Sequence, residues 1–198
     1  MNVGHPQGRA CMRDLIITEN ITLDGVVEAT DNWFGPAGSP SEVDQSDHER
    51  AIREQREAAD AFLVGRVTYE QMRSYWPQQT DDATGITDYL NKVHKYVVSR
   101  TLDDSQWQPT TILRGAVDEE IRSLKGLPGR DIVSTGSITL AHALIAAGLV
   151  DEFRLFVYPV VIGHGRRLFP DGTGLTTLQP VETRRFRSGV ILLRYRTG

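Results

Sequence analysis

The chain has 198 residues, 39% of them hydrophobic, and its 22 Lys and Arg against 26 Asp and Glu give a formal net charge of -4. This length suits one domain with a sizeable hydrophobic core. The charges are interspersed rather than gathered in a basic block, which argues against nucleic acid as a partner. No apolar run approaches the roughly 18 residues of a membrane span, and the N-terminus lacks the apolar core of a secretory signal. We therefore expect a cytoplasmic protein without a membrane partner.

The N-terminal stretch MNVGHPQGRACM, residues 1–12, is polar. We expect it to form a flexible or disordered leader before a single domain at 13–198. Cys11 is the only cysteine, so an internal disulfide is impossible, and we expect it outside the packed fold. The histidines include no H-E-x-x-H pair, and one cysteine cannot supply the ligands of a zinc deaminase. We therefore expect no metal site.

Short apolar, strand-like runs alternate with helical segments through most of the chain. The strand-like runs are 15–18, 61–65, 95–99, 110–114 and 131–134. Among the helical candidates, 42–59 has opposite charges four residues apart, and 117–126 has acids in its first turn and a lysine in its last. The segment 138–148 has apolar residues near helical spacing and ends on a glycine. This alternation predicts an α/β fold with a mostly parallel sheet.

After residue 152 the pattern changes to two long strand-like runs, 152–163 and 185–196, with no helix between them. We expect these runs to pair antiparallel at one edge of the sheet, with Pro159 at a bulge or edge position. Their alternating apolar residues would leave more apolar surface than one sheet edge should expose. A homodimer through the C-terminal strands would cover that surface.

Glycine, arginine and hydroxyl residues follow three of the predicted strands. They are Gly65, Arg66, Thr68, Ser99, Arg100 and the segment STGS at 134–137. Open parallel sheets bind ligands beyond the carboxyl ends of their strands. Gly136 would let backbone amides approach an anion, and Ser137 can cap a helix whose dipole favours that anion. Two arginines at two strand ends suggest a dinucleotide with an extra ribose phosphate, although each alone is better explained as a surface or turn residue.

Five segments together resemble a known family. They are NITLDGVV, AFLVGRVTYEQM, KYVVSRTL, DIVSTGSITLAHALIAAGLVDEFRLFVYPVVIGHGRRLF and FRSGVILLRY. In this order and spacing they resemble the dihydrofolate reductase superfamily, most closely the reductase domain of the bifunctional riboflavin-biosynthesis deaminase/reductase, over residues 13–196. The resemblance implies a dihydrofolate reductase-like three-layer sandwich, with an eight-stranded, mostly parallel central sheet and antiparallel C-terminal strands. It also implies NADPH across the strand ends and pairing of two copies through the C-terminal region.

The resemblance assigns cofactor contacts to particular positions. It implies that Arg66 and Thr68 hold adenosine-side and pyrophosphate groups, that Ser99 and Arg100 lie by the ribose phosphate, and that 136–139 cradle the pyrophosphate. The full set expected at the cofactor is Thr18, Gly25, Gly65, Arg66, Thr68, Ser99, Arg100, Thr135, Gly136, Ser137, Ile138 and Thr139. Thr135 replaces the first glycine of the pair usual in dihydrofolate reductases, but it still has a backbone amide to donate.

The catalytic residues are less well marked. A hydride acceptor that gains negative charge needs a nearby proton source. In the folate enzymes this is a carboxylic acid near the start of the helix before VGR, and by chain spacing Glu49 falls closest, with Asp44 and Asp47 nearby. Asp24, beside Gly25, matches a loop that passes the nicotinamide, close to Thr18 at the predicted end of the first strand. Alternatively, Glu49 is simply solvated on a charged helix, and Asp24 belongs to an ordinary turn.

These observations predict an NADPH-dependent reductase that passes hydride to a small, pterin- or pyrimidine-like heterocycle. Trp33, Phe34 and Trp76 are candidates for the walls of the substrate pocket, although aromatic residues are more often ordinary core. One alternative is the riboflavin-pathway reductase of 5-amino-6-(ribosylamino)uracil phosphate, which would need a cationic grip on the phosphate. Another is a non-catalytic NADP(H)-binding or sensing module.

Overall fold

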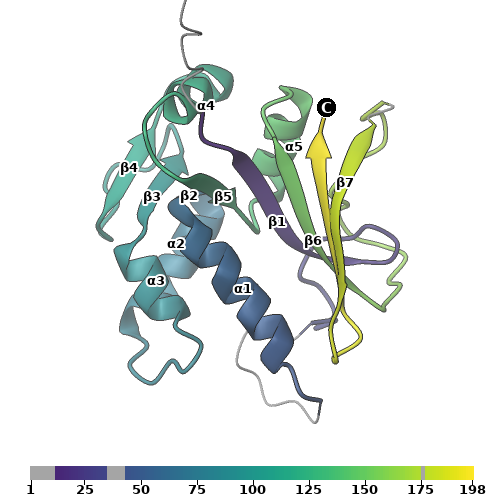
Figure 1. The fold of residues 1–198 in the computed structure, drawn as a ribbon. Helices are drawn as coiled ribbons and strands as arrows, with labels where there is room; N and C mark the ends of the chain where they lie inside the picture. The colour runs from purple at the N-terminus through teal and green to yellow at the C-terminus, as the bar shows by residue number, and fades with distance from the viewer. Residues whose placement is uncertain (1–11, 35–42, 175–176) are drawn as a thin grey trace, which may run out of the picture.

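The computed structural model describes residues 12–34, 43–174 and 177–198, whose strands form one eight-stranded sheet (Figure 1). The strands are β1 (Leu15–Thr22), β2 (Ala59–Gly65), β3 (His94–Val98), β4 (Thr110–Leu113), β5 (Asp131–Ser134), β6 (Glu152–Tyr158), β7 (Leu178–Arg185) and β8 (Ile191–Thr197). Their order across the sheet is β4-β3-β2-β5-β1-β6-β8-β7. The first six run parallel, and β8 pairs antiparallel with both β6 and β7. This confirms the predicted fold class.

Helices cover both faces of the sheet, which is why its parallel strands are apolar on both sides. The helices are α1 (Ser46–Ala58), α2 (Arg66–Tyr75), α3 (Ile86–Lys92), α4 (Val117–Lys125) and α5 (Ile138–Ala146), and a 3-10 turn follows α2 at Trp76–Gln78. Leu15 and Ile17 of β1 share a buried cluster with side chains of α4 and α5. Phe62 and Val64 of β2 pack instead with α2 and α3, on the opposite face (Figure 1).

Several helix boundaries agree with the local sequence signals. The helix predicted at 117–126 is α4, and the one at 138–148 is α5 with its C-terminal cap. Gly148 has a φ of 61°, and the amides of Gly148 and Leu149 return to the carbonyls of Ile145 and Leu144. This left-handed turn favours glycine because a side chain would be strained there. In contrast, β1 extends to Thr22, four residues beyond the predicted strand.

The C-terminal strands differ from the prediction. The run 185–196 is not one strand, because β7 ends at Arg185 and a turn through Gly189, with a φ of 87°, leads into β8. The polar segment 178–185 was not predicted as a strand, yet it forms the edge strand β7, where proline and charges are common. Pro159 follows the end of β6, which lies between β1 and β8, so Pro159 is not in an edge strand.

Most apolar residues of β6 and β8 are buried or half-buried within this chain, and Ile191 is exposed. Phe153, Leu155 and Phe156 of β6 and Leu192 of β8 are all buried. The exposed apolar surface that motivated the homodimer is therefore much smaller than expected, and the dimer itself stays a prediction. Cys11 lies outside the described residues, as does the leader up to residue 11. Within the described ranges, no helix is both long enough and apolar enough to cross a bilayer.

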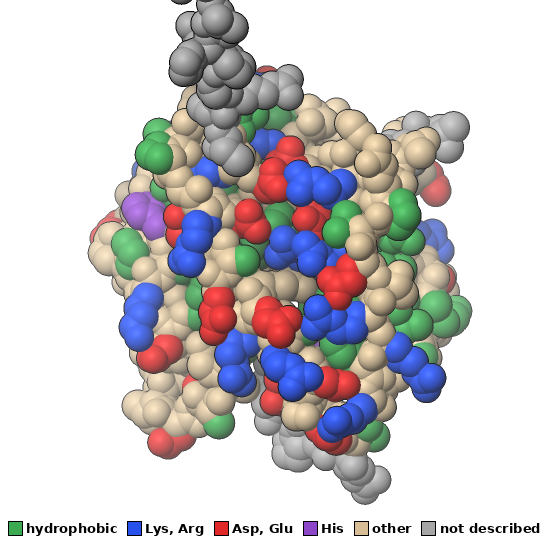
Figure 2. Space-filling view, viewed as in Figure 1, with side chains coloured by type: hydrophobic (Ala, Val, Ile, Leu, Met, Phe, Trp, Pro, Cys, Tyr) green, Lys and Arg blue, Asp and Glu red, His purple; other side chains and the backbone are tan. Residues whose placement is uncertain are grey.

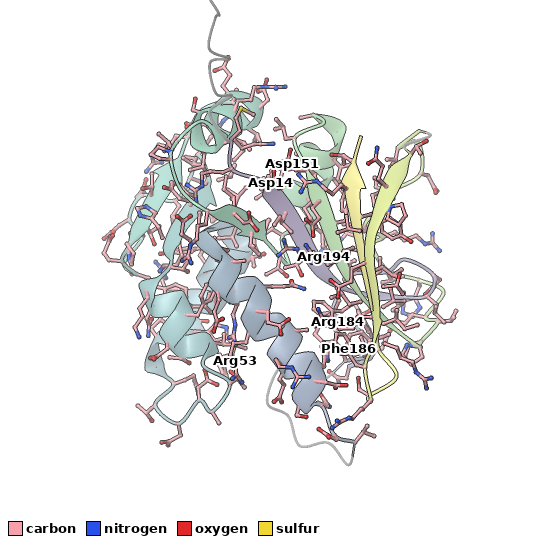
Figure 3. All side chains as sticks on the ribbon, viewed as in Figure 1. Asp14, Arg53, Asp151, Arg184, Phe186 and Arg194 are labelled. Atoms are coloured by element: carbon pink, nitrogen blue, oxygen red, sulfur yellow. The ribbon has the colours of Figure 1, made fainter. Side chains whose placement is uncertain are left out.

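An ionic network covers the part of the sheet beside α1. Figure 2 shows basic and acidic side chains alternating over this face. Glu152, buried on β6, bonds Arg154 and Arg194 at 2.7 Å each. Arg184 on β7 reaches Glu54 of α1 at 3.2 Å, and both Arg184 and Arg194 project from the C-terminal strands toward α1 (Figure 3). The network therefore helps to fix α1 against the sheet.

Candidate functional site

A crevice opens between the neighbouring strands β1 and β5. The two strands pair only from Leu15–Ile132 to Ile17–Ser134, after which β1 continues along β6 alone. The chain leaves β1 for α1 on one face of the sheet and leaves β5 for α5 on the other, in opposite directions across the sheet. Such a switch point leaves a crevice at the carboxyl ends of the strands, the usual ligand site of open α/β sheets.

A cavity of about 520 Å³ lies at this crevice. Its volume is in the range of small-molecule sites, which are mostly apolar with a few convergent polar groups. The apolar wall includes Phe34, Phe62, Met72, Trp76, Tyr89 and Phe156. The polar lining includes Thr18, Glu19, Asn20, Glu28, Gln55 and Arg56, and also Thr135 and Gly136 in the loop before α5. The residues therefore come from both faces of the sheet.

Glu19 of β1 is a buried acid in the lining of this cavity. Its side chain continues the stripe of Leu15 and Ile17, and the residue is only 5% exposed. The backbone N–H of Gly136 donates to Glu19 Oε1 at 2.7 Å. Burial raises the pKa of Glu19 to about 8, although hydrogen bonds from Gly136 and Thr135 oppose the rise. Glu19 is therefore mostly protonated at neutral pH.

Glu19 was not predicted from the sequence even though a signal was present. Leu15, Ile17 and Ile21 alternate on the buried face of β1, and Glu19 is the carboxyl that interrupts them. Acids almost never occupy a buried face without a partner or a function. The predicted strand ended at residue 18, so Glu19 fell outside it.

The loop between β5 and α5 is the segment predicted to cradle an anion. Gly136 is exposed and has a φ of 69°, a conformation that favours glycine. The Thr68 hydroxyl donates to the Gly136 carbonyl at 3.2 Å, so α2 holds this loop from the side. Ser137 precedes α5, but its hydroxyl accepts the Gly65 N–H at 2.9 Å and does not cap the helix as predicted. The structure thus brings Gly65, Thr68, Gly136 and Ser137 together.

The two candidate phosphate-binding arginines lie outside the cavity. Arg66 begins α2, is exposed, and pairs with Glu70 at 2.8 Å. Arg100 is exposed in the turn after β3, where the Ser99 hydroxyl accepts the Leu102 N–H at 2.9 Å. Because β2 and β3 are neighbours, both arginines follow adjacent strand ends beside the cradle. Their role toward a ribose phosphate stays a prediction.

The structure does not bring the predicted proton donors into the cavity. Glu49 is exposed near the start of α1, and neither it nor Asp24 belongs to the cavity lining. Asp24 accepts hydrogen bonds from the Thr22 hydroxyl and the Gly163 N–H, each at 2.7 Å. These bonds lower the pKa of Asp24 to about 2, so it is ionised at neutral pH. Gly25 has a φ of 84°, which fits the alternative interpretation of Asp24-Gly25 as a turn.

Thr18 lines the cavity from the middle of β1 rather than from its end. Its hydroxyl donates to Gln55 Oε1 on α1 at 3.2 Å. The Gln55 amide nitrogen and Arg56 NH1 are buried, and neither has a hydrogen-bond partner among the described residues. Unpaired buried donors cost about 1–3 kcal/mol each. A ligand with acceptor oxygens would pair with these donors once the two side chains turn toward the cavity.

Of the three aromatic residues predicted to wall the substrate pocket, two line the cavity. Phe34 and Trp76 line the cavity. Trp33 lies behind Phe34, with ring centroids 4.5 Å apart, and its indole N–H donates to the Glu28 carbonyl at 2.9 Å. The resulting wall can pack against a flat ring.

A second hollow, also of about 520 Å³, adjoins the first between α1 and α3. Arg56 and Tyr89 line both spaces, with the Arg56 guanidinium 5.9 Å from the Tyr89 ring centre. Its remaining lining is largely charged and includes Arg53 and Arg130. Among the described residues, no group of three or more His, Cys, Asp or Glu could hold a metal ion.

Comparison with known proteins agrees with this architecture. A family model described as the RibD C-terminal domain matches residues 13–192. The uncharacterized protein YyaP of Bacillus subtilis (strain 168) is 34% identical over 187 residues, which cover 92% of this chain and 94% of YyaP.

Two solved structures share the dihydrofolate reductase-like fold. One is a putative riboflavin biosynthesis protein from Shewanella sp. PV-4, with a TM-score of 0.70 and 16% identity, covering 93% of this chain and 99% of that one. The other is a diaminohydroxyphosphoribosylaminopyrimidine deaminase/5-amino-6-(5-phosphoribosylamino)uracil reductase from Thermotoga maritima. Its TM-score is 0.64 at 16% identity, covering 94% of this chain and 57% of that one.

Proposed function

Because the chain belongs to the RibD C-terminal domain family, we propose that it is an NADPH-dependent reductase of a small, flat heterocycle of the pterin or pyrimidine type. The observation that carries this proposal is the cavity at the β1–β5 crevice. An exposed anion cradle, an aromatic wall and a buried acid meet there, and all three suit hydride transfer to a ring.

The chain offers a contact for each part of this cofactor. The Gly136 N–H already donates to Glu19, so we assign the pyrophosphate to the amides of 137–139 and to the positive end of α5. We assign the ribose phosphate to Arg66 and Arg100, whose forked donors suit phosphate. NADPH, when bound, supplies the hydride. The crevice would then bring its reactive end to the cavity beside β1.

The substrate side of the cavity favours a ring that carries oxygen acceptors. We expect the ring to pack against Phe34 and Trp76, and its acceptors to receive the unpaired donors of Gln55 and Arg56. Burying these donors against acceptors would recover the cost of leaving them unpaired. This donor pair also gives the protein a means of distinguishing its substrate from a purely apolar ring.

One observation favours the pyrimidine phosphate as a second candidate substrate. Arg56 faces both the cavity and the charged hollow beside it. A substrate with a ring in the cavity and a phosphate tail could therefore extend past Arg56 toward Arg53 and Arg130. The Thermotoga maritima protein is named as a reductase of such a compound, 5-amino-6-(5-phosphoribosylamino)uracil.

The test is the consumption of NADPH with three substrates: a dihydropterin, a ribosylaminouracil, and the same ribosylaminouracil with its phosphate. We expect turnover with at least one of them. Arg56→Met should raise the KM for the substrate that is turned over by about tenfold or more, as expected for loss of a hydrogen bond to a charged group. Arg50→Met is the matched control, because Arg50 is exposed on the same helix and lines neither space. NADPH binding without turnover of any substrate would favour the non-catalytic module instead.

A further inference from the structure

Two glutamates on neighbouring strands are buried to a similar degree but differ in their partners. Glu152 on β6 is 2% exposed and Glu19 on β1 is 5% exposed. Glu152 bonds two arginines at 2.7 Å, and its pKa is lowered. Glu19 forms no salt bridge among the described residues, and its Oε1 accepts the Gly136 N–H. A structural acid would be expected to resemble Glu152, so the lack of a base beside Glu19 needs another explanation.

The position of Glu19 supplies that explanation. The residue lines the cavity from the part of β1 that has separated from β5, so it lies between the cradle and the aromatic wall. The other charged groups in the lining are Glu28, Arg166 and Arg56. Glu28 and Arg166 pair with each other at 2.7 Å, and Arg56 donates to the Thr84 carbonyl. Glu19 is therefore the carboxyl in this lining that is not neutralised by a basic partner.

We propose that Glu19 is the general acid of this site and provides the proton that the substrate gains when it accepts a hydride. This inference rests on the proposed reductase function. The hydride adds with its two electrons to the carbon of a C=N bond of the substrate, and the π electrons of that bond move to the nitrogen. The nitrogen forms its new N–H bond as the Glu19 O–H bond breaks. The cofactor leaves oxidised, and Glu19, now a carboxylate, regains a proton from water.

Glu19 is suited to this role because it retains its proton at neutral pH. Burial disfavours its carboxylate and raises its pKa to about 8, near the value that suits a general acid under physiological conditions. The amide that Glu19 contacts belongs to the cradle itself. A bound pyrophosphate would add negative charge next to Glu19 and disfavour the carboxylate further. Binding of NADPH should therefore take up a proton at Glu19 when the pH is near 8.

The first experiment needs no substrate. NADPH is titrated calorimetrically at about pH 8 in two buffers with different heats of ionisation, which reports the protons taken up. We expect proton uptake by the unmodified protein and none by Glu19→Gln, whose amide can still accept the Gly136 N–H. Glu28→Gln is the matched control, since it removes the other cavity carboxylate, whose pKa is lowered, and should leave the uptake unchanged.

The second experiment measures the hydride-transfer rate in a single turnover against pH. The rate of the unmodified protein should fall about tenfold per pH unit above the pKa of Glu19. Glu19→Gln should be slower by at least 100-fold, the lower range for loss of a general acid, and should lose this pH dependence. Glu19→Asp, which keeps a carboxyl, should recover part of the rate.

The outcomes separate this inference from the proposed function. NADPH binding without proton uptake, together with an unchanged rate for Glu19→Gln, would overturn the role of Glu19 and leave the reductase intact. Absence of NADPH binding would instead reject the reductase. If Glu19→Gln does not fold, carbon-13 NMR of glutamate-labelled unmodified protein gives the answer. One carboxyl should titrate near pH 8, and ionisation of every glutamate by about pH 6 would contradict the proposal.

Discussion

At the scale of single residues, the described part of the chain contains buried charges that are compensated and one buried acid that is not. Glu152 shows the compensated arrangement, because Arg154 and Arg194 hold its carboxylate in place. Glu19 has backbone and hydroxyl donors but no base, so its ionised form is disfavoured. The difference follows from position: Glu152 lies in the ionic network beside α1, whereas Glu19 lies at the cavity.

Glu19 should therefore make the fold less stable as the pH rises. Its pKa is about 8 in the folded protein against 4.5 for the ordinary group, so the folded state holds an extra proton between these values. We consider the contribution of Glu19 alone to the free energy of unfolding. This contribution should be most favourable below about pH 4.5, and it should fall by at most about 5 kcal/mol toward pH 8. Urea unfolding at about pH 5 and pH 8 measures this, and Glu19→Gln should have a smaller fall. Equal falls in both proteins would contradict the burial argument.

The arginines at the strand ends make a second prediction at this scale. Arg66→Ala or Arg100→Ala should weaken NADPH binding by about 1.5–3 kcal/mol at low salt and barely change NADH binding, because only NADPH has the ribose phosphate. Glu70→Gln should strengthen NADPH binding, since Glu70 competes for Arg66. Quenching of tryptophan fluorescence measures both affinities, and Trp76 lines the cavity. Equal losses for the two cofactors would argue against this assignment.

At the scale of elements, α3 depends on a lysine that is fully buried. Lys95 on β3 donates to the carbonyls of Leu90 at 2.6 Å and Val93 at 3.0 Å, and its Nζ is 4.7 Å from the Trp107 ring centre. These carbonyls belong to the end of α3, which contributes Tyr89 and Leu90 to the cavity. Lys95 therefore couples the stability of α3 to the shape of the site.

We expect Lys95→Met to destabilise the protein by about 1–3 kcal/mol, because two buried carbonyls would lose their donor. Lys92→Met is the control, since Lys92 is exposed and its pair with Asp88 should contribute less than about 1 kcal/mol. Chemical denaturation of both variants gives the comparison. A Lys95→Met protein as stable as the control would show that the lysine is dispensable.

Local patterns in the sequence predicted the parallel strands from their apolar runs. They also predicted the helices α4 and α5 from the residues at their ends. Edge strand β7 was missed because its proline and charges do not resemble a buried strand. Glu19 was missed for a different reason, since burial of a polar residue depends on which loop packs over it, here the β5–α5 loop with Gly136. Glu49 was favoured by chain spacing alone, but α1 reaches the cavity nearer its C-terminal end, at Gln55 and Arg56.

At the scale of the whole molecule, the two edges of the sheet differ in length, because β4 is short and β7 is long. The edge formed by β7 carries Pro180 and a register shift between Pro180 and Glu182, features that discourage pairing with another strand. If two copies associate through the C-terminal region, we therefore expect contact through side chains such as Val181 and Ile191, which are exposed, rather than through a continuous sheet. Light scattering at micromolar concentration tests this: a dimer is predicted, and the 22.1 kDa mass of a monomer would contradict it.

We propose above all that the crevice between β1 and β5 binds NADPH with its reactive ring beside Glu19. The most direct test is a crystal structure of the protein with NADPH. We predict the pyrophosphate on the amides of 137–139, the adenosine over the ends of β2 and β3, and the nicotinamide in the cavity within reach of Glu19. NADPH bound elsewhere on the molecule, or a crevice that stays empty at saturating NADPH, would contradict the account.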